Sequence, residues 1–133
     1  QTLNDEHYIF DFLKNHDYYG FYRHELAVRR ALMYPPFSRI TRILARGTDE
    51  HTVEEAMARV AAAVREELAG VDGATVLGPA RAPLGRIGGN FRHHLILKAR
   101  DTHSVRPALR RASAEKLPRG VYLEIDVDPF DML

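Results

Sequence analysis

From residue 38 onward, apolar residues recur at every second position in some segments and at every third or fourth position in others, which predicts alternating strands and helices. β-branched residues favour a strand over 38–46, and apolar positions on one face predict a helix over 52–68, namely Val53, Met57, Val60, Val64 and Leu68. The pattern then predicts a short strand at 75–78, a strand at 91–100, a helix from about residue 104 and a last strand at 121–128. This order is typical of an α+β fold of the split βαβ (ferredoxin-like, βαββαβ) kind. We expect a four-stranded antiparallel sheet with two helices on one face and the first strand between the third and fourth.

Turn and capping residues predict where these elements begin and end. Thr52 and Glu55 form a capping-box pattern at the start of the first helix. Ser104 is expected to cap the second helix, with Pro107 in its first turn. A Pro- and Gly-rich stretch over 78–89 is expected to be irregular, and Gly88-Gly89-Asn90 predicts a turn into the next strand.

Two further helices are predicted before this region. Apolar residues between 8 and 13, after a cap at Asn4 or Asp5, surround so much of a helix that one small neighbour could not bury them. A second helix is expected over 17–33 and ends before Pro35 and Pro36. We therefore expect a helical appendage at 1–35 and a compact domain at 36–133.

Composition narrows the class of protein. With 133 residues, of which 45% are hydrophobic, the chain suffices for one compact domain and a small appendage. It has no cysteine, which excludes a disulfide and a Cys-ligated zinc site, and a cytoplasmic location is the expectation. No apolar run approaches the roughly 20 residues of a membrane span, so no membrane partner is expected. Because the chain begins at Gln1, we expect it to be a piece of a longer protein.

A net charge of +1 hides a separation of charge along the chain. Residues 81–119 contain ten Lys or Arg and two Asp or Glu, whereas residues 1–80 contain nine and twelve, and residues 120–133 contain none and four. A surface field depends on local charge, so the basic block can attract a polyanion although the whole chain is nearly neutral.

Alternation along the strand 91–100 separates a core side from a cationic side. The core side carries Phe91, His93, Leu95, Leu97 and Ala99, and the other side carries Arg92, His94, Ile96, Lys98 and Arg100. This second side is a candidate track for phosphates, which Arg81 and Arg86 before it, and Arg106, Arg110 and Arg111 after it, could extend. The predicted DNA-binding residues are Arg81, Arg86, Arg92, Lys98 and Arg100.

The alternative is a ladder of ion pairs on the same side of the sheet. Glu124, Asp126 and Asp128 alternate with apolar residues of the last strand, and Arg42 and Arg46 of the intervening strand are well placed to pair with them. Such exposed pairs contribute only about 0.2–1 kcal/mol each. The residues alone leave both polyanion binding and a self-paired surface open.

No pattern of catalytic or metal-binding residues is complete. His93 and His94 are adjacent in a strand and point to opposite faces, so they cannot share a metal without other ligands. Residues 85–89 resemble a phosphate loop but precede a strand, which favours a hairpin turn. The acidic residues near 126–131 are better explained by ion pairs than by magnesium, and the aromatic residues near 18–22 by a core than by base stacking. We expect no catalytic residue, metal or cofactor in this chain.

Three stretches together resemble the C-terminal end of the PriA (primosomal protein N-prime) family of replication-restart DNA helicases. They comprise residues 15–18 with 21–22, 25–26 and 34–37; residues 76–84 with 91–92 and 95–98; and residues 123–129 with 132–133. Residues 1–4 are also similar to the segment that follows the last helicase motif in that family. The similarity spans almost the whole chain.

The resemblance implies that residues 1–35 end the second helicase lobe and that 36–133 form the C-terminal domain. The parent would be an ATP-dependent 3′–5′ DNA helicase at stalled forks, with its ATP, Mg and Zn sites outside this chain. The implied partners are branched or single-stranded DNA, the acidic and hydrophobic C-terminal tail of the single-stranded DNA-binding protein SSB, the remaining helicase domains and primosome proteins. By position, the SSB tail would contact the region of Arg106 and Arg110.

Three functions follow as hypotheses. The first is a domain that binds DNA backbone at branched or stalled forks and helps dock the SSB tail. The second is a purely protein-docking domain without direct DNA contact, in which an Arg beside an apolar groove holds a peptide carboxylate. The third is an RNA- or small-ligand-binding ferredoxin-like domain, which is less consistent with Arg and His at the outward positions of the central strands.

Overall fold

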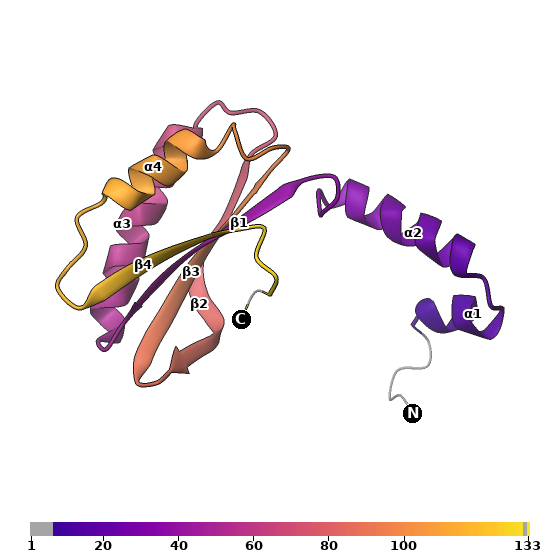
Figure 1. The fold of residues 1–133 in the computed structure, drawn as a ribbon, viewed down its shortest axis with the longest axis horizontal. Coiled ribbons are helices and arrows are strands. Elements are labelled where there is room, and N and C mark those ends of the chain that lie inside the picture. Colours follow the sequence, from indigo (N-terminus) through magenta and orange to yellow (C-terminus); the bar gives the residue numbers. More distant parts are fainter. Residues whose placement is uncertain (1–6, 132) are drawn as a thin grey trace. The chain divides into compact units, whose positions relative to one another are not determined.

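The first part of the chain is a pair of helices. The computed structural model describes residues 7–131 and 133, and the chain divides into two compact units, residues 1–37 and 38–133. The first unit contains α1 (Ile9–Lys14) and α2 (Tyr18–Ala31) (Figure 1). Asp17 caps α2 by accepting a hydrogen bond from the N–H of Gly20 at 2.7 Å. The hydroxyl of Tyr8 donates to Glu25 at 2.6 Å and connects the two helices.

Both predicted N-terminal helices are confirmed, and they bury none of their side chains fully. Tyr18 and Tyr22 are 68% and 58% exposed, in keeping with a helix pair whose apolar residues outnumber the positions that one neighbour can cover. The predicted cap at Asn4 or Asp5, and residues 1–4 and 132 of the family resemblance, lie outside the described residues.

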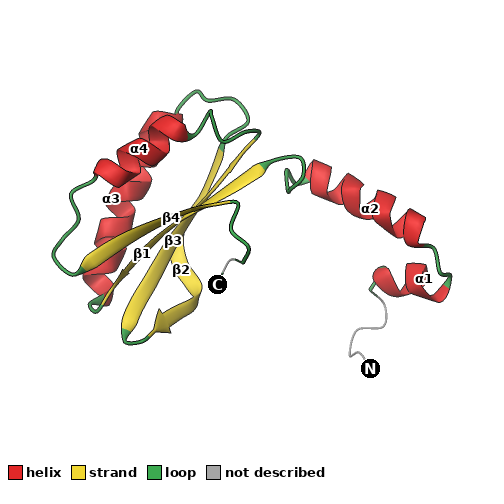
Figure 2. Cartoon of the chain, viewed as in Figure 1, coloured by secondary structure: helices red, strands yellow, loops and turns green. Residues whose placement is uncertain are grey.

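The second unit has the predicted strand–helix–strand–strand–helix–strand order. Its elements are β1 (Arg39–Gly47), α3 (Glu50–Leu68), β2 (Thr75–Ile87), β3 (Asn90–Ala99), α4 (Arg106–Ala114) and β4 (Val121–Val127). Within the described residues they form a four-stranded antiparallel sheet in the order β2-β3-β1-β4, and α3 and α4 lie side by side on one face (Figures 1 and 2). The α+β split βαβ fold is therefore confirmed, with β1 between β3 and β4.

The core lies between α3 and the two central strands. Ile43 of β1 stands opposite Leu95 of β3, and both are fully buried. The apolar face that the sequence predicts for α3 is the buried one: Val53, Met57, Val60, Val64 and Leu68. The second helix, α4, reaches this core through the small side chains of Ala108 and Ala112.

The structure corrects three local predictions. Helix α3 is capped by Asp49, which accepts the N–H of Thr52 at 2.8 Å, so Thr52 is not the cap. Ser104 does not cap α4 either, because its N–H and hydroxyl bond to Asp101 and the helix begins two residues later without a side-chain cap. Strand β2 does not stop at residue 78 but continues to Ile87 across two irregularities in its pairing with β3.

Replacing Leu97 by Ala is expected to lower the free energy of unfolding by about 2–5 kcal/mol, because it opens a cavity between β3 and the helices. Leu97 is 1% exposed and belongs to the core. Leu77→Ala is the matched control on β2, where the side chain is 44% exposed, and should change the free energy by about 0.5 kcal/mol or less. Urea unfolding followed by circular dichroism measures both, and equal losses would contradict this location of the core.

Candidate partner and nucleic-acid interface

The five predicted DNA-binding residues do not share one face of the sheet. Arg92 and Lys98 lie on the outer face, away from the helices, because their strand neighbours Leu95 and Leu97 point into the core. Residues that stand opposite each other in a ladder share a side. Arg81 stands opposite His93, and Arg86 opposite Phe91, so both arginines lie on the helix side. The expectation that Arg81 and Arg86 extend an outer cationic face is wrong.

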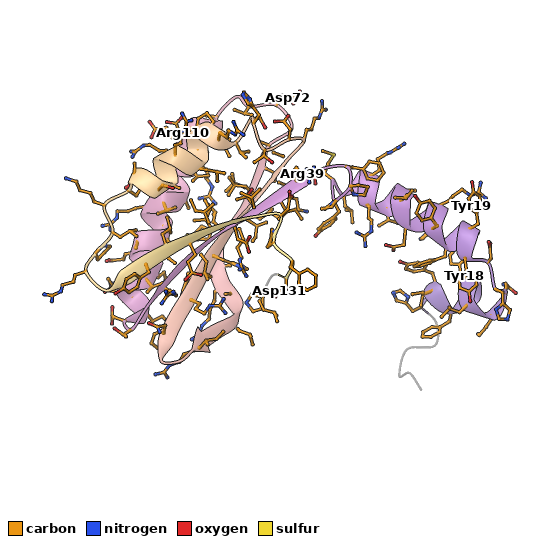
Figure 3. All side chains as sticks on the ribbon, in the orientation of Figure 1. Tyr18, Tyr19, Arg39, Asp72, Arg110 and Asp131 are labelled. Atoms are coloured by element: carbon orange, nitrogen blue, oxygen red, sulfur yellow. The ribbon has the colours of Figure 1, made fainter. Side chains whose placement is uncertain are left out.

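The centre of the outer face is occupied by the chain itself. Arg92 is only 9% exposed, and its guanidinium donates to the carbonyl oxygens of Leu84, at 3.1 Å, and Leu133, at 2.9 Å. Arg42 donates to the same Leu133 oxygen at 2.6 Å. The segment after β4, which includes Asp131, therefore turns back over the sheet (Figure 3). The two guanidinium groups are engaged with main-chain oxygens in this fold.

The rest of the outer face contains the ion-pair ladder that the sequence analysis gives as the alternative. Arg42 pairs with Asp126 at 3.5 Å, and Arg46 pairs with Glu124 while its guanidinium lies 5.0 Å from the ring of Tyr122. Outside this ladder, Arg39, which stands opposite the core residue Ala99, pairs with Asp128 just after β4 at 3.0 Å. The acidic residues of β4 thus neutralise arginines of β1, which reduces the attraction of this face for phosphates.

His94 lies among these cations. Burial lowers its pKa first, and the positive charges of Arg42 and Arg92 and the neighbouring His93 lower the pKa further. The Nδ1 atom of His94 is buried without a hydrogen-bond partner among the described residues. His94 is therefore neutral at pH 7 and adds no charge to the outer face.

On the helix side, a second charged cluster lies near the β2–β3 hairpin. Arg81 pairs with Glu50, the first residue of α3, at 3.1 Å, and the same carboxylate is 3.9 Å from Nε2 of His93. Arg86 is exposed, and its guanidinium lies 4.8 Å from the ring centroid of Phe91. His93 and His94 face opposite sides, as predicted.

The remaining two predicted DNA-binding residues lie at the far end of β3. Lys98 is half-buried, and exposed Arg100 follows the strand and lies against Gly73. The hairpin turn at Gly88 and Gly89 is at the opposite end of β3, because Ile87 pairs with Asn90. The predicted DNA-binding set is therefore divided between two ends and two faces of the sheet.

The two residues predicted to bind a partner, by contrast, line one groove. Arg106 and Arg110 are one turn apart on α4 and line a cavity of about 630 Å³; Arg110 is labelled in Figure 3. A second cavity of about 450 Å³ shares Ser113 and Ile125 with the first and continues along β4. Partly buried apolar side chains line the two cavities, namely Leu109, Leu117, Leu123 and Ile125. We call this continuous depression the α4–β4 groove.

Charge is available at this groove. Arg111, the next residue, pairs with Glu115 at 2.6 Å, but neither Arg106 nor Arg110 has an ion-pair partner among the described residues. The groove thus combines two exposed guanidinium groups with an apolar lining. This combination suits a ligand that has a carboxylate and an apolar side chain close together.

The groove and the segment over the outer face differ in how far sequence could reveal them. The apolar alternation of β4 predicts that Leu123 and Ile125 face the helices, but not that α4 leaves them partly uncovered. No pattern in residues 129–133 indicates a return across Arg42 and Arg92.

No group of three or more metal-binding side chains is present within residues 7–131 and 133, and none of the helices described there could span a membrane.

Comparison with known proteins connects this domain to replication restart. The family model of the primosomal protein N C-terminal domain matches residues 30–130. Replication restart protein PriA of Synechocystis is 33% identical over 99% of the chain, and those of Treponema pallidum and Bacillus subtilis are 34% and 28% identical over its whole length. The chain spans 16–20% of the length of these relatives. A de novo designed protein, Foldit4, is similar in fold over 71% of the chain and 99% of its own, with a TM-score of 0.52 at 17% identity.

The lowered pKa of His94 predicts a pH dependence of stability. The folded protein binds the proton less readily than the unfolded chain, whose histidine pKa is about 6.5. Stability is therefore fully present above about pH 6.5 and falls as the pH decreases toward the lower pKa of the folded state. His94→Gln should lose less stability than the wild type between about pH 7.5 and 5.5 in urea unfolding. His103→Gln, which changes an exposed histidine, is the control, and the same pH slope in all three proteins would contradict the environment of His94.

Proposed function

The chain belongs to the family of primosomal protein N C-terminal domains, and we propose that it is a binding module of a replication restart protein that docks the acidic tail of SSB in the α4–β4 groove. The observation that carries this proposal is the position of Arg106 and Arg110, which lie without an ion-pair partner beside an apolar lining. On the outer face, by contrast, Arg42 and Arg46 form ion pairs, and Arg92 forms hydrogen bonds with main-chain oxygens.

The chemistry of the groove fits an acidic and hydrophobic tail. A carboxylate gains charge-assisted hydrogen bonds from a guanidinium, and these are about twice as strong as hydrogen bonds between neutral groups. An apolar side chain next to that carboxylate can bury surface against Leu109 and Ile125. A tail with only one of these features would satisfy half of the site, so the groove selects for both.

DNA contact at the β2–β3 hairpin is the second candidate function. Arg86 is exposed near the Gly88-Gly89 turn, and Ile87 beside it is 49% exposed. A cation on a projecting hairpin can approach the phosphate backbone without reading base sequence. Arg81 lies on the same side of β2, although Glu50 partly neutralises it. We propose that the hairpin contributes to binding of branched or single-stranded DNA, and that Arg92 stabilises the fold rather than contacting DNA.

The proposal also covers the longer protein of which this chain would be a part. We propose that the chain is the C-terminal part of an ATP-dependent 3′–5′ DNA helicase that acts at stalled replication forks in the cytoplasm. Its ATP, Mg and Zn sites, and most contacts with primosome proteins, would lie in the rest of that protein. Residues 1–35, whose helices leave aromatic side chains exposed, would complete the preceding helicase lobe.

Reversing the charge of Arg110 tests the docking site. Arg110→Glu should weaken binding of a fluorescent SSB-tail peptide roughly tenfold or more, because an attractive contact becomes a repulsive one. Arg106→Glu should act in the same direction. Arg59→Glu, which changes charge equally at an exposed position of α3, should leave the affinity unchanged in fluorescence anisotropy. Equal affinities for all four proteins would place the peptide elsewhere.

The salt dependence of DNA binding tests the hairpin. Each phosphate contact that is lost should lower the slope of log K against log salt concentration by about 1. Arg86→Gln is expected to show this decrease with forked and single-stranded DNA. Arg100→Gln reports separately on the far end of β3, and Arg59→Gln is the control for charge. An unchanged slope for Arg86→Gln would exclude the hairpin, whatever the result for Arg100.

A further inference from the structure

One edge of the sheet lies beside the α4–β4 groove. Strand β4 pairs with β1 on one side only, and the strand order within the described residues makes it the last strand of the sheet. A strand in this position presents main-chain N–H and C=O groups that another extended segment can pair with. The other edge, β2, is interrupted by two irregularities in its pairing, whereas the pairing of β4 is continuous over all seven of its residues.

The direction of the β4 main chain can be assigned from its pairing. The N–H of Asp128 donates to the carbonyl oxygen of Ile40 at 2.7 Å. In an antiparallel pair, hydrogen-bonded and non-hydrogen-bonded residue pairs alternate, so Asp126 and Glu124 bond to β1 in the same way. The N–H and C=O groups of Leu123 and Ile125 therefore point toward the open edge.

The side chains of these two residues point into the groove. Leu123 and Ile125 line its cavities, together with Leu109 and Leu117 from the helix side. The same stretch of β4 thus offers open main-chain groups at its edge and an apolar surface on its helix side. A segment that pairs with β4 would place every second side chain against this surface.

We propose that the α4–β4 groove binds its partner by strand addition: an extended peptide pairs with the open edge of β4, and the side chains on its helix side supply both apolar groups against Leu123 and Ile125 and a carboxylate for Arg106 and Arg110. The proposal rests on the proposed function, because both use the same groove. It adds main-chain pairing to β4 as the mode of recognition.

Charge selects this occupant over a second copy of the chain. The guanidinium groups of Arg106 and Arg110 line the groove without an ion-pair partner among the described residues, so a peptide with a carboxylate on its helix side complements it. Two β4 strands paired edge to edge would bring Glu124 and Asp126 of one copy near the same residues of the other. Like charges opposite each other destabilise a strand pair.

Amide hydrogen exchange of the full chain tests the strand pairing directly. The first probe is the SSB-tail peptide, and the second is a synthetic peptide that alternates Val with Thr and has Asp in place of the last Val, so that its carboxylate lies on the same side as the Val side chains. With bound peptide, the amides of Leu123 and Ile125 should exchange at least about tenfold more slowly. The amides of Glu124 and Asp126 should change little, because they already bond to β1. Protection that is equal for the two sets of amides, or absent at Leu123 and Ile125 with bound peptide, would overturn strand addition.

N-methylation of the synthetic peptide is the matched chemical test. Methylating the main-chain nitrogens of either the Thr residues or the residues between them removes one alternate set of donors. One set should weaken binding about tenfold or more, and the other should be tolerated, because only one set faces β4. Equal effects of the two sets would overturn the proposal.

The outcomes separate the two proposals. If the SSB tail binds with sensitivity to Arg110→Glu, but β4 amides are not protected, docking in the groove stands and strand addition fails. If the SSB tail does not bind but the synthetic peptide protects Leu123 and Ile125, strand addition stands and the tail is the wrong partner. A dimer of the chain that excludes both peptides from β4 overturns strand addition of a partner.

Discussion

The packing of α3 against the central strands determines which side chains are available for binding. Val53, Met57 and Val60 fill the space above β1 and β3, and Ile43 and Leu95 meet them from the sheet. Because side chains alternate along a strand, burial of one side assigns every other residue of β1 and β3 to the outer face. The polar outer positions are therefore a consequence of the core, and what they do depends on their own neighbours.

Those neighbours make the outer face largely self-contained. Glu124 and Asp126 of the acidic block meet Arg46 and Arg42, which precede the basic block at 81–119, as ladder partners in the sheet. Arg92 is a clear case, because its guanidinium satisfies carbonyl oxygens from two distant segments. A buried guanidinium with two such bonds is costly to expose, since its partners would also lose their hydrogen bonds. Local charge density along a chain thus overestimates the potential of a surface when the opposite charge comes from a neighbouring strand.

Sequence was sufficient for features that depend on periodicity and insufficient for those that depend on distant contacts. The strand and helix order, the face of α3 and the ladder between Arg42 and Asp126 all follow from spacing. The continuation of β2 through its Pro- and Gly-rich part does not, because pairing with β3 overrides the local preference for irregular structure. The position of Leu133 against Arg42 is a contact between residues 91 apart, which no local pattern encodes. For the candidate site, residue positions indicated Arg106 and Arg110, but the groove beside them required the structure.

The groove exists because α4 reaches the core with small residues. Ala108 and Ala112 bring α4 against α3, while Leu109 and Ile125 remain only partly buried. An open edge strand beside apolar side chains is prone to unwanted pairing, and natural proteins protect such edges with charge. Here Arg106 and Arg110 on one side, and Glu124 and Asp126 on the strand, supply that charge. Glu124 and Asp126 oppose pairing between copies, whereas Arg106 and Arg110 favour a partner with a carboxylate on its helix side, so protection of the edge and selection of the ligand depend on opposite charges on the two sides of β4.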